Sequence, residues 1–293
     1  MDTRKLTKEE VITAFRRMRQ RLIDRLEQYQ CEFRAFAEQL HFASRFPNSQ
    51  RDSATILAKE YFDILSNDDT GKALLAKGGL CVSADNSKDG ILVTGINPSG
   101  SGHVHFCYSF KETLKNAKSG YWRNKYKEFV EGHEELLPLL SYIDFFPLHE
   151  GCQTTFMQII KDNLVLQAKI IAVTHREIER LHPRLIIHAN AQTAYYWGLS
   201  SQSTWMGYDL RLVSRDELPR SISDLYGRVY RISGDTGFRT ASDRINRNVY
   251  GKSALIGSIF VRHGLYDRPN HAAFRLTSGK VKVLYELSGM LCL

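Results

Sequence analysis

The sequence predicts an α/β fold: a three-layer sandwich around a short, mainly parallel four-stranded sheet, with a helical extension at the N-terminus. Short apolar runs rich in β-branched residues alternate with helical segments, an order typical of parallel sheets with right-handed crossovers. The 293 residues are 43% hydrophobic and 25% charged, which are ordinary globular values, and this length buries a core without disulfides or metals. We expect the extension over residues 1–80 and the α/β domain over residues 81–293.

The N-terminal part has helical periodicity. Over residues 7–44 apolar side chains recur every three or four positions, and Thr7 with Glu10 fits a capping box. A second amphipathic helix is predicted over about residues 53–65. The apolar faces of these helices suit either packing on the sheet or binding of a partner.

The α/β part contains four predicted strands and the helices that connect them. The strands are predicted within residues 90–96, 139–144, 185–190 and 253–261, and the helices over about 108–117, 121–130 and 154–180. The last helix should end before His182-Pro183, because the residue before a proline disfavours helical geometry. Residues 205–233 are predicted to be β-rich and irregular.

Composition limits the classes of function. The formal charge is +8, and residues 211–293 carry 14 basic and 7 acidic side chains, which suits either a polyanionic partner or a solvated basic face. Five widely spaced cysteines without a Cys-x-x-Cys pair argue against a disulfide framework, a zinc site or an iron–sulfur cluster. There is neither a long apolar run nor a signal-like start, so we expect a cytoplasmic protein that does not enter membranes.

Polar residues stand where the predicted strands end. In open α/β sheets, ligands bind at the carboxyl ends of the strands. Asn97, Asp144, Asn190 and His263 occupy these positions, and we expect Asn97, Asp144 and His263 to share one cleft. Asn190 is interpreted as a helix cap. Each of these residues, taken singly, also suits a turn or a cap.

The loop Gly95-Ile96-Asn97-Pro98-Ser99-Gly100 is unusual. It lacks the Lys-Ser or Lys-Thr of a Walker loop, the serine of a nucleophile elbow and the glycine spacing of a dinucleotide site. Successive backbone N–H groups in such a loop can cradle a phosphate.

Gly95-Ile96-Asn97-Pro98 resembles the first motif of the uracil-DNA glycosylase superfamily, nearest to its mismatch-specific and single-strand-selective branches. The similarity continues over about residues 88–275, through Tyr142–Leu148, the segment from Pro183 to Ala194, and Phe260–Asn270. It implies a hydrolase that cleaves the N-glycosidic bond of a damaged or mismatched base flipped out of single- or double-stranded DNA. It implies no metal and no organic cofactor.

The resemblance also implies a role for individual residues. Asn97 would hold the attacking water, and His263 would donate to the base as negative charge develops on it. Base-binding residues would be Asp144, Ser99, Gly100 and either Phe106 or Phe110. Leu265 and Tyr266 would wedge into the vacated stack, and Arg262 and Arg268 would contact phosphates.

Three positions depart from the family pattern. Ser99 replaces a glycine, Asp144 replaces a base-reading asparagine, and Gly264 rather than proline follows His263. An ionised aspartate offers only acceptors, whereas asparagine offers a donor and an acceptor. These changes fit altered base specificity or lost catalysis. The alternatives are therefore an inactive nucleic-acid- or nucleotide-binding protein of the same fold, or a hydrolase of a small phosphorylated ligand.

Overall fold

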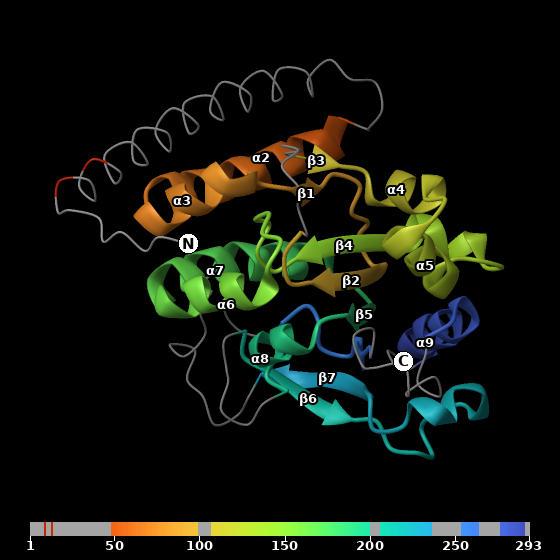
Figure 1. Ribbon diagram of the computed structural model, residues 1–293. Coiled ribbons are helices and arrows are strands. Elements are labelled where there is room, and N and C mark those ends of the chain that lie inside the picture. Colours follow the sequence, from red (N-terminus) through yellow and green to blue (C-terminus); the bar gives the residue numbers. More distant parts are fainter. Residues whose placement is uncertain are drawn as a thin grey trace, which may run out of the picture.

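The computed structural model describes positions 9 and 13 and residues 48–98, 107–199, 206–235, 253–263 and 276–290. Its centre is a six-stranded mixed sheet with the strand order β4-β2-β5-β8-β7-β6 (Figure 1). The strands are β2 (Ile91–Gly95), β4 (Leu140–Asp144), β5 (Leu185–His188), β6 (Tyr208–Leu212), β7 (Val229–Asp235) and β8 (Ile259–Arg262). A separate parallel pair is formed by β1 (Val82–Ser83) and β3 (Cys107–Tyr108). The predicted α/β class is confirmed.

The predicted four-stranded sheet is wrong in its extent. The four predicted strands correspond to β2, β4, β5 and β8, which are mutually parallel. Residues from the irregular β-rich segment add β7, antiparallel to β8, and β6, antiparallel to β7. Strand β7 pairs with backbone groups that would otherwise remain exposed along the edge of β8, and β6 does the same for the free edge of β7.

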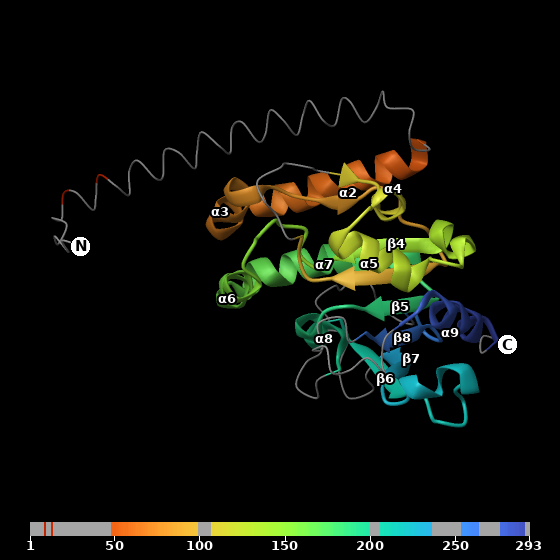
Figure 2. The same ribbon diagram turned by 45° about the vertical axis from the view of Figure 1, so that its right-hand side comes forward.

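The parallel strands are apolar because helices cover both faces of the sheet. One core contains side chains of α2 (Asn48–Ser66), α3 (Asp69–Gly78), α6 (Gln153–Asp162) and α7 (Leu164–Leu181). The opposite core contains side chains of α4 (Phe110–Asn116), α5 (Gly120–Phe129) and α9 (Ser278–Met290). Figures 1 and 2 show how the ribbons of these helices are placed around the sheet. Short helices η1 (Glu134–Leu139), η2 (Ala191–Thr193), α8 (Ala194–Trp197) and η3 (Arg220–Leu225) lie in the connections.

The helices largely follow the predicted pattern. The helix predicted over residues 154–180 is divided at Asn163, whose side chain accepts a hydrogen bond from the Leu166 N–H at 3.0 Å and so begins α7. The end of α7 is as predicted, with His182 left-handed just before Pro183. The helix predicted near residues 53–65 is α2, whereas α3 and α9 were not predicted.

The N-terminal helices within the described residues belong to the main body of the protein. Helix α2 packs on α7, where the hydroxyl groups of Tyr61 and Thr174 are 2.7 Å apart. The helix predicted over residues 7–44 lies outside the described residues, apart from positions 9 and 13. Among the described helices, none has the length and apolar character needed to cross a bilayer.

Buried Asp85 joins β1 to the start of α4. Its carboxylate accepts hydrogen bonds from the backbone N–H groups of Phe110 at 2.9 Å and Lys111 at 3.0 Å. The hydroxyl groups of Ser83 and Ser109 donate to the same carboxylate. Four donors on one carboxylate fix the segment that leads into α4 and α5.

Candidate functional site

A cavity of ≈ 590 Å³ opens at the carboxyl ends of β2, β4 and β5. This volume lies within the range of small-molecule sites, roughly 300–1,000 Å³. Asn97, Asp144 and Asn190, three of the four strand-end residues selected from the sequence, line it. The described structure therefore brings the amide of Asn97 and the carboxyl of Asp144 to one cavity.

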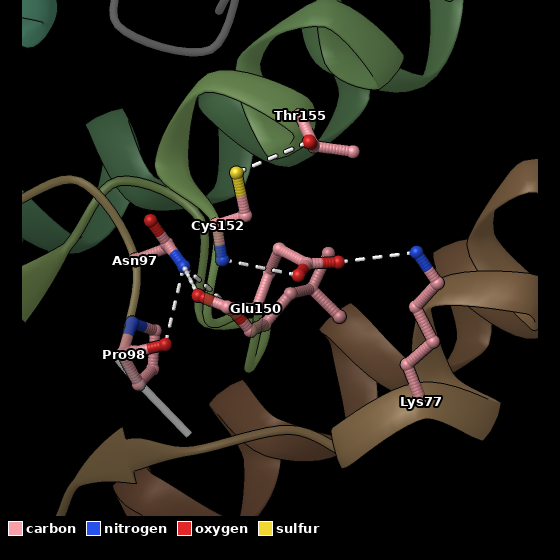
Figure 3. A network of polar contacts seen from close by, with 7 residues as sticks. Lys77, Asn97, Pro98, Glu150, Cys152 and Thr155 are labelled. Carbon is pink, nitrogen blue, oxygen red and sulfur yellow. Dashed lines mark hydrogen bonds and ion pairs between the residues drawn. The ribbon is translucent and has the colours of Figure 1, made fainter. Parts of the chain in front are cut away.

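The side chain of Asn97 is held by backbone carbonyl groups. Its Nδ2 donates to the carbonyl oxygens of Pro98 and Glu150 at 3.1 Å each, and a weaker contact of 3.4 Å reaches that of Leu148 (Figure 3). Figure 3 shows Oδ1 turned away from these carbonyls. Among the described residues Oδ1 has no hydrogen-bond partner, so it is available to accept a hydrogen bond from a ligand or a water.

The loop before α6, whose Glu150 carbonyl accepts the hydrogen bond from Asn97, is held in place by contacts of its own. The carboxylate of Glu150 accepts a hydrogen bond from the Cys152 N–H at 3.2 Å and pairs with Lys77 Nζ at 3.1 Å (Figure 3). Burial opposes ionisation of Glu150, but these two partners outweigh it and lower its pKa. At the start of α6, the hydroxyl of Thr155 donates to Cys152 Sγ at 3.1 Å and lowers the pKa of the exposed thiol.

Asp144 lies at the inner wall of the cavity, at the end of β4. The Tyr142 hydroxyl donates to its Oδ1 at 3.1 Å. A Cβ on Gly95 of the neighbouring strand would stand 2.1 Å from this oxygen and 2.3 Å from the tyrosine hydroxyl, so only glycine leaves room for the pair. Burial raises the pKa of Asp144 to about 7, and the Tyr142 hydrogen bond opposes this rise.

Aromatic side chains form much of the remaining wall: Tyr108, Tyr121, Trp122 and Tyr142. The Trp122 ring meets the rings of Tyr121 and Tyr142 edge to face, at centroid distances of 4.9 and 5.5 Å. Phe110, one of the two alternatives that we predicted for base stacking, does not line the cavity. It is fully buried behind Tyr142 and Trp122, because it is the first residue of α4 and faces the core.

The sequence analysis did not select the aromatic residues that do line the cavity. Tyr108 lies two positions before Phe110. Tyr121 and Trp122 follow Gly120, the first residue of α5, whose φ is +73°. The sequence feature that could have indicated these cavity residues is a glycine followed by two adjacent aromatic residues. His149, in the loop after β4, is a further cavity-lining residue that was not selected.

His263 follows β8 at the same edge of the sheet but is not among the described residues that line the cavity. It is buried, with Nε2 3.4 Å from Glu128 Oε2 and its ring 6.0 Å from that of Phe129. Lys125 is also buried and contacts the same Glu128 oxygen at 2.5 Å. Burial lowers the pKa of Lys125 to about 8, against the opposing charge of Glu128. The expected meeting of His263 with Asn97 and Asp144 is therefore not seen, because α5 covers the histidine.

The other selected residues are distributed as follows. Asn190 is a cap, as predicted: its Oδ1 accepts a hydrogen bond from the Gln192 N–H at 2.8 Å. Arg262 is exposed at the end of β8. Outside the described residues lie Ser99, Gly100, Phe106, Leu265, Tyr266 and Arg268. Within the described part of the chain, no three His, Cys, Asp or Glu side chains are grouped so as to hold a metal ion.

Comparisons of the chain with protein-family models, curated proteins and solved structures gave no match. The resemblance to uracil-DNA glycosylases therefore remains a prediction from the motifs.

Proposed function

We propose that the cavity binds a nucleobase turned out of DNA and that the protein hydrolyses the bond between that base and its deoxyribose. The observation that carries this proposal is the shared cavity of Asn97 and Asp144 with aromatic walls at the strand ends. Aromatic side chains stack on unpaired bases, and a positive net charge favours a polyanionic partner.

The geometry of Asn97 suits the positioning of water. Three carbonyl contacts fix its Nδ2, so that Oδ1 is the atom left to accept a hydrogen bond. In the reaction the C1′–N bond breaks with its electron pair going to the base, and the water oxygen forms the new bond to C1′. The water releases a proton to solvent, and the departing base takes one up. Because an amide does not titrate near neutrality, Asn97 acts by orientation and proximity.

One group of the cavity can stabilise the departing base. Asp144, when protonated, is a hydrogen-bond donor on the cavity wall. His263 does not line the cavity in the described residues, so the role we predicted for it is not part of this proposal.

A second function is binding of a nucleobase or nucleic acid without chemistry. The observation that favours it is the burial of His263 against Glu128. A protein of this kind would keep the cavity and the basic charge but would lack one donor to the leaving base.

The test is base excision. The protein is incubated with single- and double-stranded oligonucleotides that carry uracil, hypoxanthine, oxidised pyrimidines or mismatched thymine, and abasic sites are cleaved with alkali. We expect strand breaks with the wild type and with Asn67→Ala, which changes an exposed asparagine just after α2, but not with Asn97→Ala. Salt-sensitive binding without breaks supports the second function, and neither breaks nor binding contradicts both.

A further inference from the structure

The two oxygens of the Asp144 carboxyl have different surroundings. Oδ1 accepts the hydrogen bond from the Tyr142 hydroxyl and packs beside Gly95. Oδ2 has no hydrogen-bond partner among the described residues, and Asp144 lines the cavity. Because Tyr142 donates to Oδ1, a proton on this carboxyl resides on Oδ2.

No cation lines the described part of the cavity wall to compensate a charge on Asp144. Besides Asp144, the titratable groups that line it are Cys81, Tyr108, Tyr121, Tyr142, His149 and Glu150. Burial raises the pKa of Cys81, Tyr108 and Tyr142, so these groups are neutral at physiological pH. Glu150 is paired with Lys77. The carboxyl of Asp144 thus has access to both a neutral and an ionised state near neutrality.

We propose that Asp144 is the specificity-determining residue of the cavity and reads the edge of a nucleobase in two ways. As a neutral acid it donates from Oδ2 to a ring carbonyl, and as a carboxylate it accepts hydrogen bonds from two adjacent N–H groups. This inference rests on the proposed nucleobase site and names the chemistry of the base that occupies it.

Hypoxanthine and guanine differ by a single amino group, and their binding distinguishes the neutral from the ionised carboxyl of Asp144. Hypoxanthine presents a ring N–H beside a ring carbonyl, which matches a neutral carboxyl. Guanine has the same N–H and carbonyl, but its 2-amino group places a second donor beside the ring N–H. A carboxylate accepts from both of these donors, whereas it repels the carbonyl oxygen of hypoxanthine.

The experiment is titration calorimetry of the full chain with inosine and guanosine between pH 5.5 and pH 8.5. We expect the dissociation constant of inosine to rise about tenfold from pH 6 to pH 8, because the neutral fraction of the carboxyl falls by that factor. Guanosine should bind over the whole range, so that the preference for guanosine over inosine increases with pH.

Two variants make the assignment specific. Asp144→Asn carries a donor and an acceptor at every pH, so we expect its affinity for inosine to be independent of pH. Tyr142→Phe removes the hydrogen bond that lowers the pKa of Asp144, so the midpoint of the pH dependence should move upward. Persistence of the pH dependence in Asp144→Asn would assign it to another group, such as His149, and would overturn the proposal.

The proposal is also overturned if the wild type binds inosine equally at pH 6 and pH 8, or binds neither nucleoside. Excision that depends on Asn97 combined with pH-independent nucleoside binding removes this inference and leaves the proposed hydrolysis. The reverse result, pH-dependent binding without excision, removes the hydrolysis and leaves the inference.

Discussion

Replacing Asp144 by asparagine should stabilise the protein at alkaline pH. Asparagine keeps an acceptor for the Tyr142 hydroxyl but cannot ionise. Burial raises the pKa of Asp144 from 3.8 to about 7. A folded-state pKa above the unfolded-state value makes the wild type lose stability as pH rises from about 4 to 7. A shift of this size corresponds to about 4 kcal/mol, and solvent in the open cavity reduces that value.

The measurement is urea unfolding of the wild type and Asp144→Asn at pH 5 and pH 8, followed by tryptophan fluorescence. The difference in the free energy of unfolding between the two proteins should grow by about 2 kcal/mol from pH 5 to pH 8. Asp216→Asn makes the same chemical change at an exposed position and should show no such growth. An equal difference at both pH values, or a variant less stable than the wild type at pH 8, refutes the reasoning.

Three further predictions concern residues that stabilise the fold or shape the cavity. Asp85→Ala leaves four donors without their acceptor, and urea unfolding should show a loss of about 3 kcal/mol; an unchanged midpoint would contradict the role of this carboxylate. Gly95→Ala places a methyl group against Asp144 and Tyr142, so calorimetry should show nucleoside binding weakened at least about tenfold while the protein stays folded by circular dichroism. Burial opposes ionisation of Glu179, but hydrogen bonds from Ser253 and Tyr208 and the His175 ring at 3.6 Å outweigh it and lower the pKa of Glu179 from 4.5 to about 2. Because this pKa is depressed, Glu179 contributes about 3 kcal/mol above pH 4.5 that is lost as pH falls toward 2. An acid-unfolding curve of Glu179→Gln with the wild-type slope would exclude that contribution.

The sequence predicted a structural element correctly where the residues of one short segment are enough to define that element. The apolar runs that became β2, β4, β5 and β8 were predictable, because strands buried on both faces need no polar side chains. The end of α7 at His182 was predictable from the proline that follows it. By contrast, α9 has a weak amphipathic pattern, and its position is set by packing on the sheet face that also holds α5.

The site was predictable only in part. Asn97 follows β2 and Asp144 ends the parallel neighbouring strand β4, so chain order and strand direction were enough to bring them together. His263 ends a strand of the same sheet, yet α5 inserts Lys125 and Glu128 beside it. Which helix covers a given strand end depends on long-range packing, and no spacing in the sequence encodes it.

The sequence by itself determined the α/β class, the four parallel strands and the presence of an amide and a carboxyl at adjacent strand ends. These features follow from hydrophobic pattern and from backbone geometry, which act over a few residues. Only the tertiary structure decided that the sheet has six strands, that Phe110 is buried while Tyr108, Tyr121 and Trp122 line the cavity, and that Asp144 has a raised pKa. Burial and the choice of neighbours are properties of the packed chain, and they set both the walls of the cavity and the charge within it.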